Sequence, residues 1–297
     1  MRKGTLTISI DLELAWGVWD VLSEADLRRA EADERPICAA LLDLFDRHGV
    51  PVTWAMVAAL LDEPSARSRP GSPRCWYAPD IIERIVGAKV AHEIGSHGGR
   101  HIYFDRIPEP EARDDLAFAA DVHRRNGLAF NSFVYPRNAV GHMGVLEEAG
   151  LLTVRGRDVG WTRVARGAHP AIRRALNLAD KMLPIPPPMV TPRRCGALID
   201  VPGSLLLLGR NGVRRFVLPA VTRAKLRMGL ERAQRTAGTF HLWFHPSNFY
   251  HRRDEQLGIL GWFLAHAAEA ARHGRIEIRT MGEHARAEPG KRAPALA

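Results

Sequence analysis

The sequence predicts an α/β fold in which short strands alternate with amphipathic helices, as in a (β/α) barrel. The first observation is this alternation, which is typical of parallel sheets and barrels. The second is composition: the 297 residues are 46% hydrophobic and 25% charged, which excludes a disordered, collagen-like or coiled-coil chain. The third is that seven or eight strand–helix units follow one another, a number that favours a barrel over an open sheet.

The predicted elements can be read off in order along the chain. β-Branched and apolar runs predict strands at Thr5–Asp11, Pro51–Val57, Glu93–Ser96, Asn131–Tyr135, Leu151–Arg155, Leu198–Val201, Thr239–Phe244 and Arg275–Arg279. Apolar residues at helical spacing predict helices at Pro36–His48, Pro79–Val86, Pro110–Arg125, Gly141–Ala149, Leu218–Thr236 and Glu255–His273. Proline in the first turn of several of these helices is compatible with a helix start.

These elements predict a single barrel over residues 1–284, followed by a flexible tail at 285–297. The stretch 63–79 is rich in proline, serine and arginine and predicts a surface loop. A segment near 165–196 interrupts the rhythm and predicts an insertion. It has apolar residues at helical spacing beside Arg173, Arg174 and Lys181, so it is either a packed insertion with a rigid linker, or a lid or basic surface that meets lipid headgroups.

The charge balance, 42 basic against 33 acidic residues and a net +9, permits attraction to phosphate, nucleic acid or an anionic membrane, and equally a solvated arginine-rich surface. No nucleic-acid-binding motif accompanies the charge, so we expect no nucleic-acid partner. Three separated cysteines suit a reducing compartment. The chain starts with a strand pattern rather than an apolar signal segment, so we expect a cytoplasmic protein, with peripheral contact at the inner face of the membrane as an option.

The strongest chemical motif is the segment 92–101, HEIGSHGGRH, in which a strand ends in a glycine-rich turn. His97 and His101 are four residues apart, near enough to share one metal ion if the second half is helical. A second pair with the same spacing, His241 and His245, lies in a strand pattern. Four residues of a strand span roughly 13 Å, so that second pair is read as two separate residues.

Two carboxylates, Asp11 and Glu13, follow the first predicted strand. Positions two apart in a strand share a face, so both side chains can enter one site. The alternative is a solvated strand end or a helix cap. With His97 and His101 at the end of another strand, the pattern favours a metal site of two histidines and one carboxylate, with a second carboxylate beside it.

His245 ends the strand Thr239–Phe244, and Trp243 lies on the same face, where it could form the wall of a pocket. The carboxyl ends of the strands are where the active sites of barrels form. We therefore predict a functional role for His245, against the alternative of an ordinary loop histidine.

In this order, the pieces resemble the polysaccharide deacetylase family, the NodB-homology carbohydrate esterases. The resemblance runs from residue 5 to residue 248 and implies a distorted (β/α) barrel of seven strands. It implies that Asp11 is the catalytic base, that Glu13, His97 and His101 are the metal ligands, and that His245 is the general acid. The third motif of the family places an arginine before a proline, whereas here Arg137 follows Pro136.

By resemblance, Arg137 is assigned to the catalytic set, where it supplies the charge from the other side of the proline unless the base is oriented differently. Tyr135, Asn138 and Trp243 are expected to contact the substrate. The fourth motif, an aspartate and a tryptophan that support the arginine, is loosely similar to Asp158 and Trp161.

The expected activity is metal-dependent hydrolysis of an N-acyl group, acetyl above all, on an amino sugar. The substrate would be a cytoplasmic precursor of a surface polysaccharide or a glycolipid, on a phosphate-bearing carrier. Zinc is the expected ion for this ligand set, and cobalt, nickel or iron would also suit it.

Two alternatives remain from other classes. The altered third motif is compatible with a non-catalytic carbohydrate- or membrane-binding protein on a deacetylase scaffold. Two histidines and one carboxylate also describe a non-haem iron oxygenase, although those enzymes use an all-β scaffold.

Overall fold

Strand β1 (Gly4–Leu12) runs through the middle of the sheet, and all nine of its residues are buried. The computed structural model describes residues 3–159 and 169–286. Side chains alternate along β1: Leu6, Ile8 and Ile10 belong to the main apolar core, and Thr7, Ser9 and Asp11 are buried polar residues on the opposite face. β1 therefore separates a packed apolar layer from a polar interior.

The sheet has the strand order β6-β7-β5-β4-β3-β2-β1-β9-β8, with β10 paired to β1 off this path. The remaining strands are β2 (Thr53–Met56), β3 (Glu93–Ser96), β4 (Ser132–Val134), β5 (Thr153–Arg155), β6 (Arg193–Cys195), β7 (Leu198–Asp200), β8 (Leu205–Leu206), β9 (Thr239–Phe244) and β10 (Ile276–Ile278). The seven strands from β7 to β9 are parallel to one another, and β6 adds an antiparallel edge beside β7. In the described residues no pairing joins β6 to β8, so the barrel is distorted and open.

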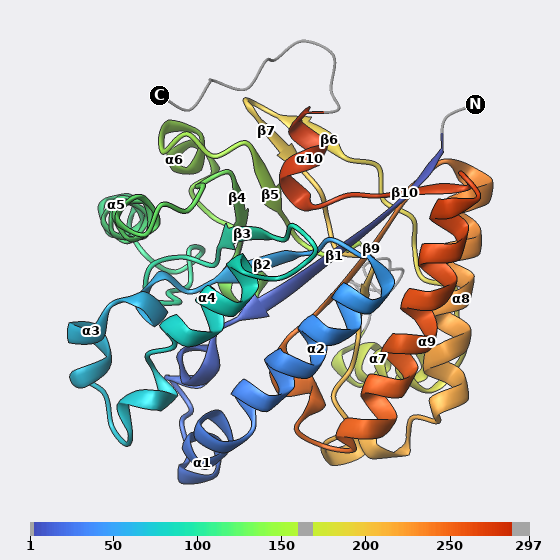
Figure 1. Cartoon of the computed structure of the whole chain (residues 1–297), viewed down its shortest axis with the longest axis horizontal. Helices are drawn as coiled ribbons and strands as arrows, with labels where there is room; N and C mark the ends of the chain where they lie inside the picture. The colour runs from blue at the N-terminus through green and yellow to red at the C-terminus, as the bar shows by residue number, and fades with distance from the viewer. Residues whose placement is uncertain (1–2, 160–168, 287–297) are drawn as a thin grey trace.

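The helices surround this sheet (Figure 1). They are α1 (Glu24–Ala32), α2 (Glu34–His48), α3 (Glu63–Arg67), α4 (Pro79–Val86), α5 (Glu109–Arg125), α6 (Met143–Glu148), α7 (Pro170–Met182), α8 (Pro219–Thr236), α9 (Arg253–Arg272) and α10 (Met281–Arg286). α2 packs against α9, and α9 against α8, on one side of β1. None of the described helices has the length and apolarity needed to cross a membrane.

The α/β alternation expected from the sequence is confirmed, and every predicted strand and helix has a counterpart in the structure. The expectation of a surface loop over 63–79 is confirmed only in part, because most of the stretch is exposed or half-buried but some of it is helical or buried. That stretch contains α3 and buries Cys75, Trp76 and Ala78. The Trp76 ring meets the Trp16 ring edge-on at 5.2 Å, and the Trp16 indole N–H donates to the Trp76 carbonyl at 2.9 Å. Tryptophan pairing therefore draws this polar segment into the core.

The insertion expected near 165–196 contains α7, and its last residues form β6, which pairs with β7. Arg173 and Arg174, which the sequence placed on a basic face there, have side chains outside the described residues. Of the expected tail, residues 285 and 286 end α10, and residues 287–297 lie outside the described residues.

Candidate active site

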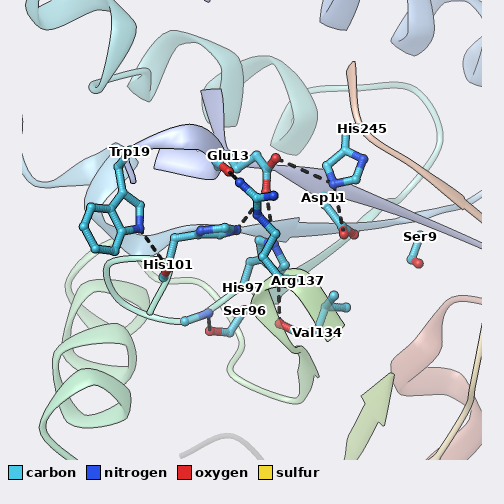
Figure 2. A network of polar contacts seen from close by, with 12 residues as sticks. Ser9, Asp11, Glu13, Trp19, Ser96, His97, His101, Val134, Arg137 and His245 are labelled. Atoms are coloured by element: carbon cyan, nitrogen blue, oxygen red, sulfur yellow. Dashed lines mark hydrogen bonds and ion pairs between the residues drawn. The ribbon is translucent and has the colours of Figure 1, made fainter. Parts of the chain in front are cut away.

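The carboxyl ends of the parallel strands bring Asp11, Glu13, His97 and His245 together, although they are far apart in the chain (Figure 2). Asp11 lies in β1, Glu13 follows it, His97 follows β3 and His245 follows β9. Parallel strands present these ends at the same edge of a sheet, which is why residues from three strands share one site.

Glu13, His97 and His101 form a cluster whose ligand atoms lie within 4.8 Å of one another. Glu13 Oε2 is 3.3 Å from His97 Nε2 and 3.0 Å from His101 Nε2. Both histidines are buried. A Cβ at Gly17 would come within 2.0 Å of Glu13 Oε1, so a residue without a side chain at 17 leaves room for this carboxylate.

The donor set of this cluster fits a divalent cation. His97 Nδ1 lies 2.8 Å from the Val134 carbonyl, which can only accept, so Nδ1 carries the proton and Nε2 presents a lone pair toward Glu13. His101 is also buried: its Nε2 faces Glu13 Oε2, and its Nδ1 has no hydrogen-bond partner in the described part of the chain. The lone pair of His97 Nε2 and the Glu13 carboxylate face each other, and the imidazole of His101 lies unsatisfied beside them. A cation bound among these three side chains would satisfy all of them.

Burial alone would raise the pKa of Glu13, but the charges of His245 and His101 and the hydrogen bonds of His101 and His97 hold that pKa well below its usual range. Burial lowers the pKa of His101 despite the opposing charge of Glu13. An ionised carboxylate and a neutral imidazole are the forms that bind metals.

The segment from His97 to His101 is a loop, so the helical geometry under which residues four apart share a face does not apply. Gly98 has φ +80° and His101 has φ +59°. The Asp115 carboxylate of α5 accepts the backbone N–H groups of Gly99 and Arg100 at 2.6 and 2.9 Å. The Trp19 indole donates to the His101 carbonyl at 3.2 Å (Figure 2). These contacts, not a helix, bring the two imidazoles together, with ring centroids 5.0 Å apart.

Asp11 forms a two-point ion pair with Arg155, which is the last residue of β5. The two hydrogen bonds, from Arg155 Nη1 and Nη2, measure 2.8 and 2.6 Å, and both side chains are buried. Burial alone would raise the pKa of Asp11, but Arg155, together with His97 and His245, lowers it. Arg155 therefore orients Asp11 and keeps it ionised.

A further buried chain of hydrogen bonds supports Arg155. Its Nη1 donates to Ser9 Oγ at 2.8 Å, and Ser9 Oγ lies 2.9 Å from His241 Nε2. His241 Nδ1 is 2.9 Å from the Val201 carbonyl, so Nδ1 is the donor and Ser9 donates to Nε2. Burial and the charge of Arg155 lower the pKa of His241 to about 3, so the ring stays neutral. His241 thus supports Arg155 through Ser9 and has a different position from His245.

His245 Nε2 lies 3.6 Å from both Asp11 Oδ2 and Glu13 Oε1. The Trp243 ring stacks over the Arg155 guanidinium at 4.3 Å and meets the His245 ring at 5.7 Å. Both His245 and Trp243 line a pocket of about 530 Å³ whose wall includes Asp11 and Glu13. Trp243 thus packs on the arginine that holds Asp11 and also forms part of the pocket wall.

The other residues predicted from the sequence are placed differently. Arg137 and Asn138 line the pocket. Arg137 does not pair with Asp11: its Nη2 donates to the Gly17 carbonyl at 2.9 Å and lies 3.4 Å from Asp20 Oδ1. Arg155, rather than Arg137, is the arginine that pairs with Asp11.

The structure does not place Tyr135 where the sequence predicted a substrate contact. Its side chain is buried, donates to the Gly141 carbonyl at 2.9 Å and is absent from the described pocket lining. Asp158 lies against Gly203, where a Cβ would come within 2.3 Å of its Oδ1. Trp161 lies outside the described residues.

The comparisons with known proteins agree with this architecture. Residues 31–143 match the polysaccharide deacetylase family model, a segment that includes His97 and His101 but not Asp11, Glu13 or His245. No curated protein sequence matches the chain. The resemblance to polysaccharide deacetylases that the motifs indicated is confirmed for this segment and, through the solved structures, for the fold.

Three solved structures show the same fold over nearly the whole chain. A Mycobacterium smegmatis protein named as a polysaccharide deacetylase has a TM-score of 0.66 at 16% identity, covering 100% of this chain and 96% of its own. A polysaccharide deacetylase named from Pseudomonas aeruginosa PAO1 has a TM-score of 0.64 at 16% identity, covering 97% and 92%. The Puue allantoinase has a TM-score of 0.62, with the same identity and coverage as the Pseudomonas protein.

Proposed function

We propose that the chain is a metal-dependent hydrolase that removes an N-acyl group, acetyl above all, from an amino sugar. The observation that carries the proposal is the meeting of two groups at one pocket: the Glu13–His97–His101 cluster, which reaches the pocket through Glu13, and Asp11 beside His245. The polysaccharide deacetylase match over residues 31–143 supports deacylation as the reaction.

Glu13, His97 and His101 would hold the ion. When bound, a divalent ion supplies a Lewis acid that lowers the pKa of water from about 15.7 toward 7. Zinc suits two imidazoles and a carboxylate, and cobalt, nickel or iron remain alternatives for the same ligands.

The chain's own residues account for the proton transfers. Asp11, kept ionised by Arg155, accepts the proton of the attacking water. His245, on the other side of Asp11 and partly open to the pocket, gives a proton to the departing amine. A carbon–oxygen bond forms and the carbon–nitrogen bond breaks, so one amide and one water give a carboxylic acid and a free amine.

The proposed substrate is an N-acylated amino sugar on a phosphate-bearing carrier. Arg29, Arg137 and Arg214 line the same pocket as Asp11, and their positive charge supports an anionic group on the substrate. We propose that this substrate is a cytoplasmic precursor of a surface polysaccharide or a glycolipid. The three cysteines, none of which forms a disulfide, are compatible with a reducing compartment.

The deciding experiment combines metal analysis with acyl release from N-acetyl sugars supplied free, nucleotide-linked and lipid-linked. Asp11→Asn should lower hydrolysis by about 10²–10⁴-fold and leave the metal content unchanged, because Asp11 is the base and not a ligand. His101→Ala should lose both metal and hydrolysis. Asp105→Asn, which changes an exposed carboxylate, is the matched control and should keep both.

The outcomes separate the alternatives. Full activity of Asp11→Asn would remove Asp11 from the role of base. Bound metal without acyl release from any sugar would instead favour the non-catalytic binding protein. The oxygenase alternative rests on the two histidines and one carboxylate, but those enzymes use an all-β scaffold, which differs from the parallel α/β sheet of this chain.

A further inference from the structure

Three large apolar side chains are exposed within six residues, where the 3-10 helix Gly212–Phe216 leads into α8. Val213 is 67% exposed, Phe216 is 58% exposed and Leu218 is 64% exposed. Single exposed apolar residues need no explanation, but a group of them marks an interaction surface. We call Val213, Arg214, Arg215, Phe216, Leu218 and Arg223 the mouth patch.

The mouth patch is strongly basic. The stretch 201–230 contains six arginine or lysine residues and no aspartate or glutamate. No ion pair of Arg214, Arg215 or Arg223 with an acidic side chain is found among the described residues. The Arg215 guanidinium lies over the Phe216 ring at 4.8 Å, so charge and apolar surface occupy the same place. These arginines are available to an external anion.

The mouth patch adjoins the opening of the candidate active site. Asn211 and Arg214, from the same short segment, line the pocket that contains Asp11 and His245. On the neighbouring side, Lys225 of α8 contacts Asp180 of α7, and α7 carries the exposed Leu178. An exposed apolar side chain thus also lies on the helix next to α8.

We propose that the mouth patch docks the protein on an anionic lipid surface, with the pocket opening toward the headgroups. Val213, Phe216 and Leu218 would enter the boundary between headgroups and acyl chains, and the arginines would contact lipid phosphates. A lipid-linked sugar could then reach Asp11 while its lipid stayed in the membrane. The docking itself does not require the proposed deacylation.

Charge favours lipid over a second copy of the chain. A symmetric dimer through the mouth patch would place the same arginines against each other, because a two-fold interface pairs a patch with itself. A membrane that contains anionic lipids supplies the opposite charge instead. For the 165–196 segment the sequence left a lipid-facing surface as one of two alternatives, whereas the described side chains locate the strongest candidate at 213–218.

The test is cosedimentation of the full chain with vesicles of equal parts phosphatidylcholine and phosphatidylglycerol, compared with vesicles of phosphatidylcholine alone. We expect binding to the anionic vesicles that weakens as salt is raised. Arg215→Glu/Arg223→Glu should weaken the partition coefficient by at least about 25-fold, since each basic residue near the surface contributes roughly a factor of five. Val213→Ser/Phe216→Ser should weaken it by about tenfold or more.

The matched control is Arg47→Glu/Arg84→Glu, which makes the same change in net charge on exposed positions of α2 and α4. It should keep most of the vesicle binding. Activity on a soluble N-acetyl sugar reports separately on the proposed function, and the mouth-patch variants should leave it unchanged.

Three results would overturn the proposal: no sedimentation of the wild-type chain at low salt, an equal loss in the control variant, or a dimer in solution that Phe216→Ser dissolves without any vesicle binding. A chain that binds vesicles but releases no acyl group would leave the docking intact and count against the deacylase.

Discussion

Two buried carboxylates near the same pocket have opposite pKa shifts. Asp11, 2% exposed at the end of β1, has a lowered pKa. Glu34, 1% exposed at the start of α2, has its pKa raised to about 7. Burial raises the pKa in both cases. The difference is the partner: Asp11 meets the Arg155 guanidinium on two atoms, and Glu34 accepts a hydrogen bond from the Tyr250 hydroxyl.

The comparison shows that burial sets the cost of a charge and that the partner decides whether the charge is kept. A phenol offers one neutral hydrogen bond, which lowers the pKa of Glu34 by less than burial raises it. A guanidinium supplies a full charge and two hydrogen bonds. A buried carboxylate that must be ionised at neutral pH therefore needs a cationic partner, as Asp11 has in Arg155.

Replacing Arg155 should leave the ionised form of Asp11 with less stabilisation than a buried carboxylate such as Glu34 has. We expect this change to have the largest effect on stability and hydrolysis. Arg155→Met leaves a buried carboxylate without its cation. Breaking a buried ion pair from one side costs about 3–5 kcal/mol, which should appear as a lower free energy of unfolding in urea at pH 7. Hydrolysis should fall as far as in Asp11→Asn, because the base loses both its orientation and its charge.

The double variant Asp11→Asn/Arg155→Met is the control. It removes the unpaired charge of the buried Asp11 carboxylate, so it should be more stable than Arg155→Met alone. If the single and double variants were equally unstable, the loss would come from the packing of Arg155 against Trp243 rather than from the ion pair.

Much of this site could be predicted because its residues end strands that the apolar pattern predicts well. Asp11, His97 and His245 were all found in this way. Arg155 has the same signal, since it is the last residue of the predicted strand 151–155, but the family motif has its arginine beside a proline, where this chain has Arg137. A charge that ends an otherwise apolar strand is therefore informative whatever its sign.

Other features depend on tertiary contacts that no local pattern contains. α1 has a capping box at Ser23 and Asp26, but little apolar periodicity predicts it. β8 is only two residues long and exists because it pairs with β9. Glu34 looks like an ordinary acid in the first turn of a helix, where exposure is the rule. Its burial depends on Tyr250, which is more than 200 residues away.

The second test removes the charge of Glu34. Because its native pKa is raised from 4.5 to about 7, the native state binds the proton more tightly than the unfolded state does. The stabilisation from this tighter proton binding is complete below the pKa of the unfolded state, 4.5, and is lost as the pH rises through the native pKa of about 7. Glu34→Gln should therefore be more stable than the wild type at pH 8, by up to about 3 kcal/mol, and should lose this advantage toward pH 5.

Urea unfolding of both chains at several pH values measures this difference. Glu83→Gln, which changes an exposed glutamate of α4, is the matched control and should show no pH-dependent gain. A constant difference between Glu34→Gln and the wild type across this range would mean that Glu34 stays ionised, as Asp11 does.

The smallest effect we expect is at Arg137, whose charge is exposed rather than buried. Its side chain is 48% exposed, and it pairs with Asp20 at 3.4 Å. Exposed ion pairs contribute about 1 kcal/mol or less, so Arg137→Gln should unfold almost as the wild type does. Because Arg137 lines the pocket without touching Asp11, its loss should raise KM for phosphate-bearing sugars and leave kcat within about threefold. Steady-state kinetics on phosphorylated and free sugars separate the two parameters. A fall in kcat as large as that of Arg155→Met would mean that Arg137 orients Asp11. It would also mean that an exposed guanidinium can orient this carboxylate as well as the buried guanidinium of Arg155 does.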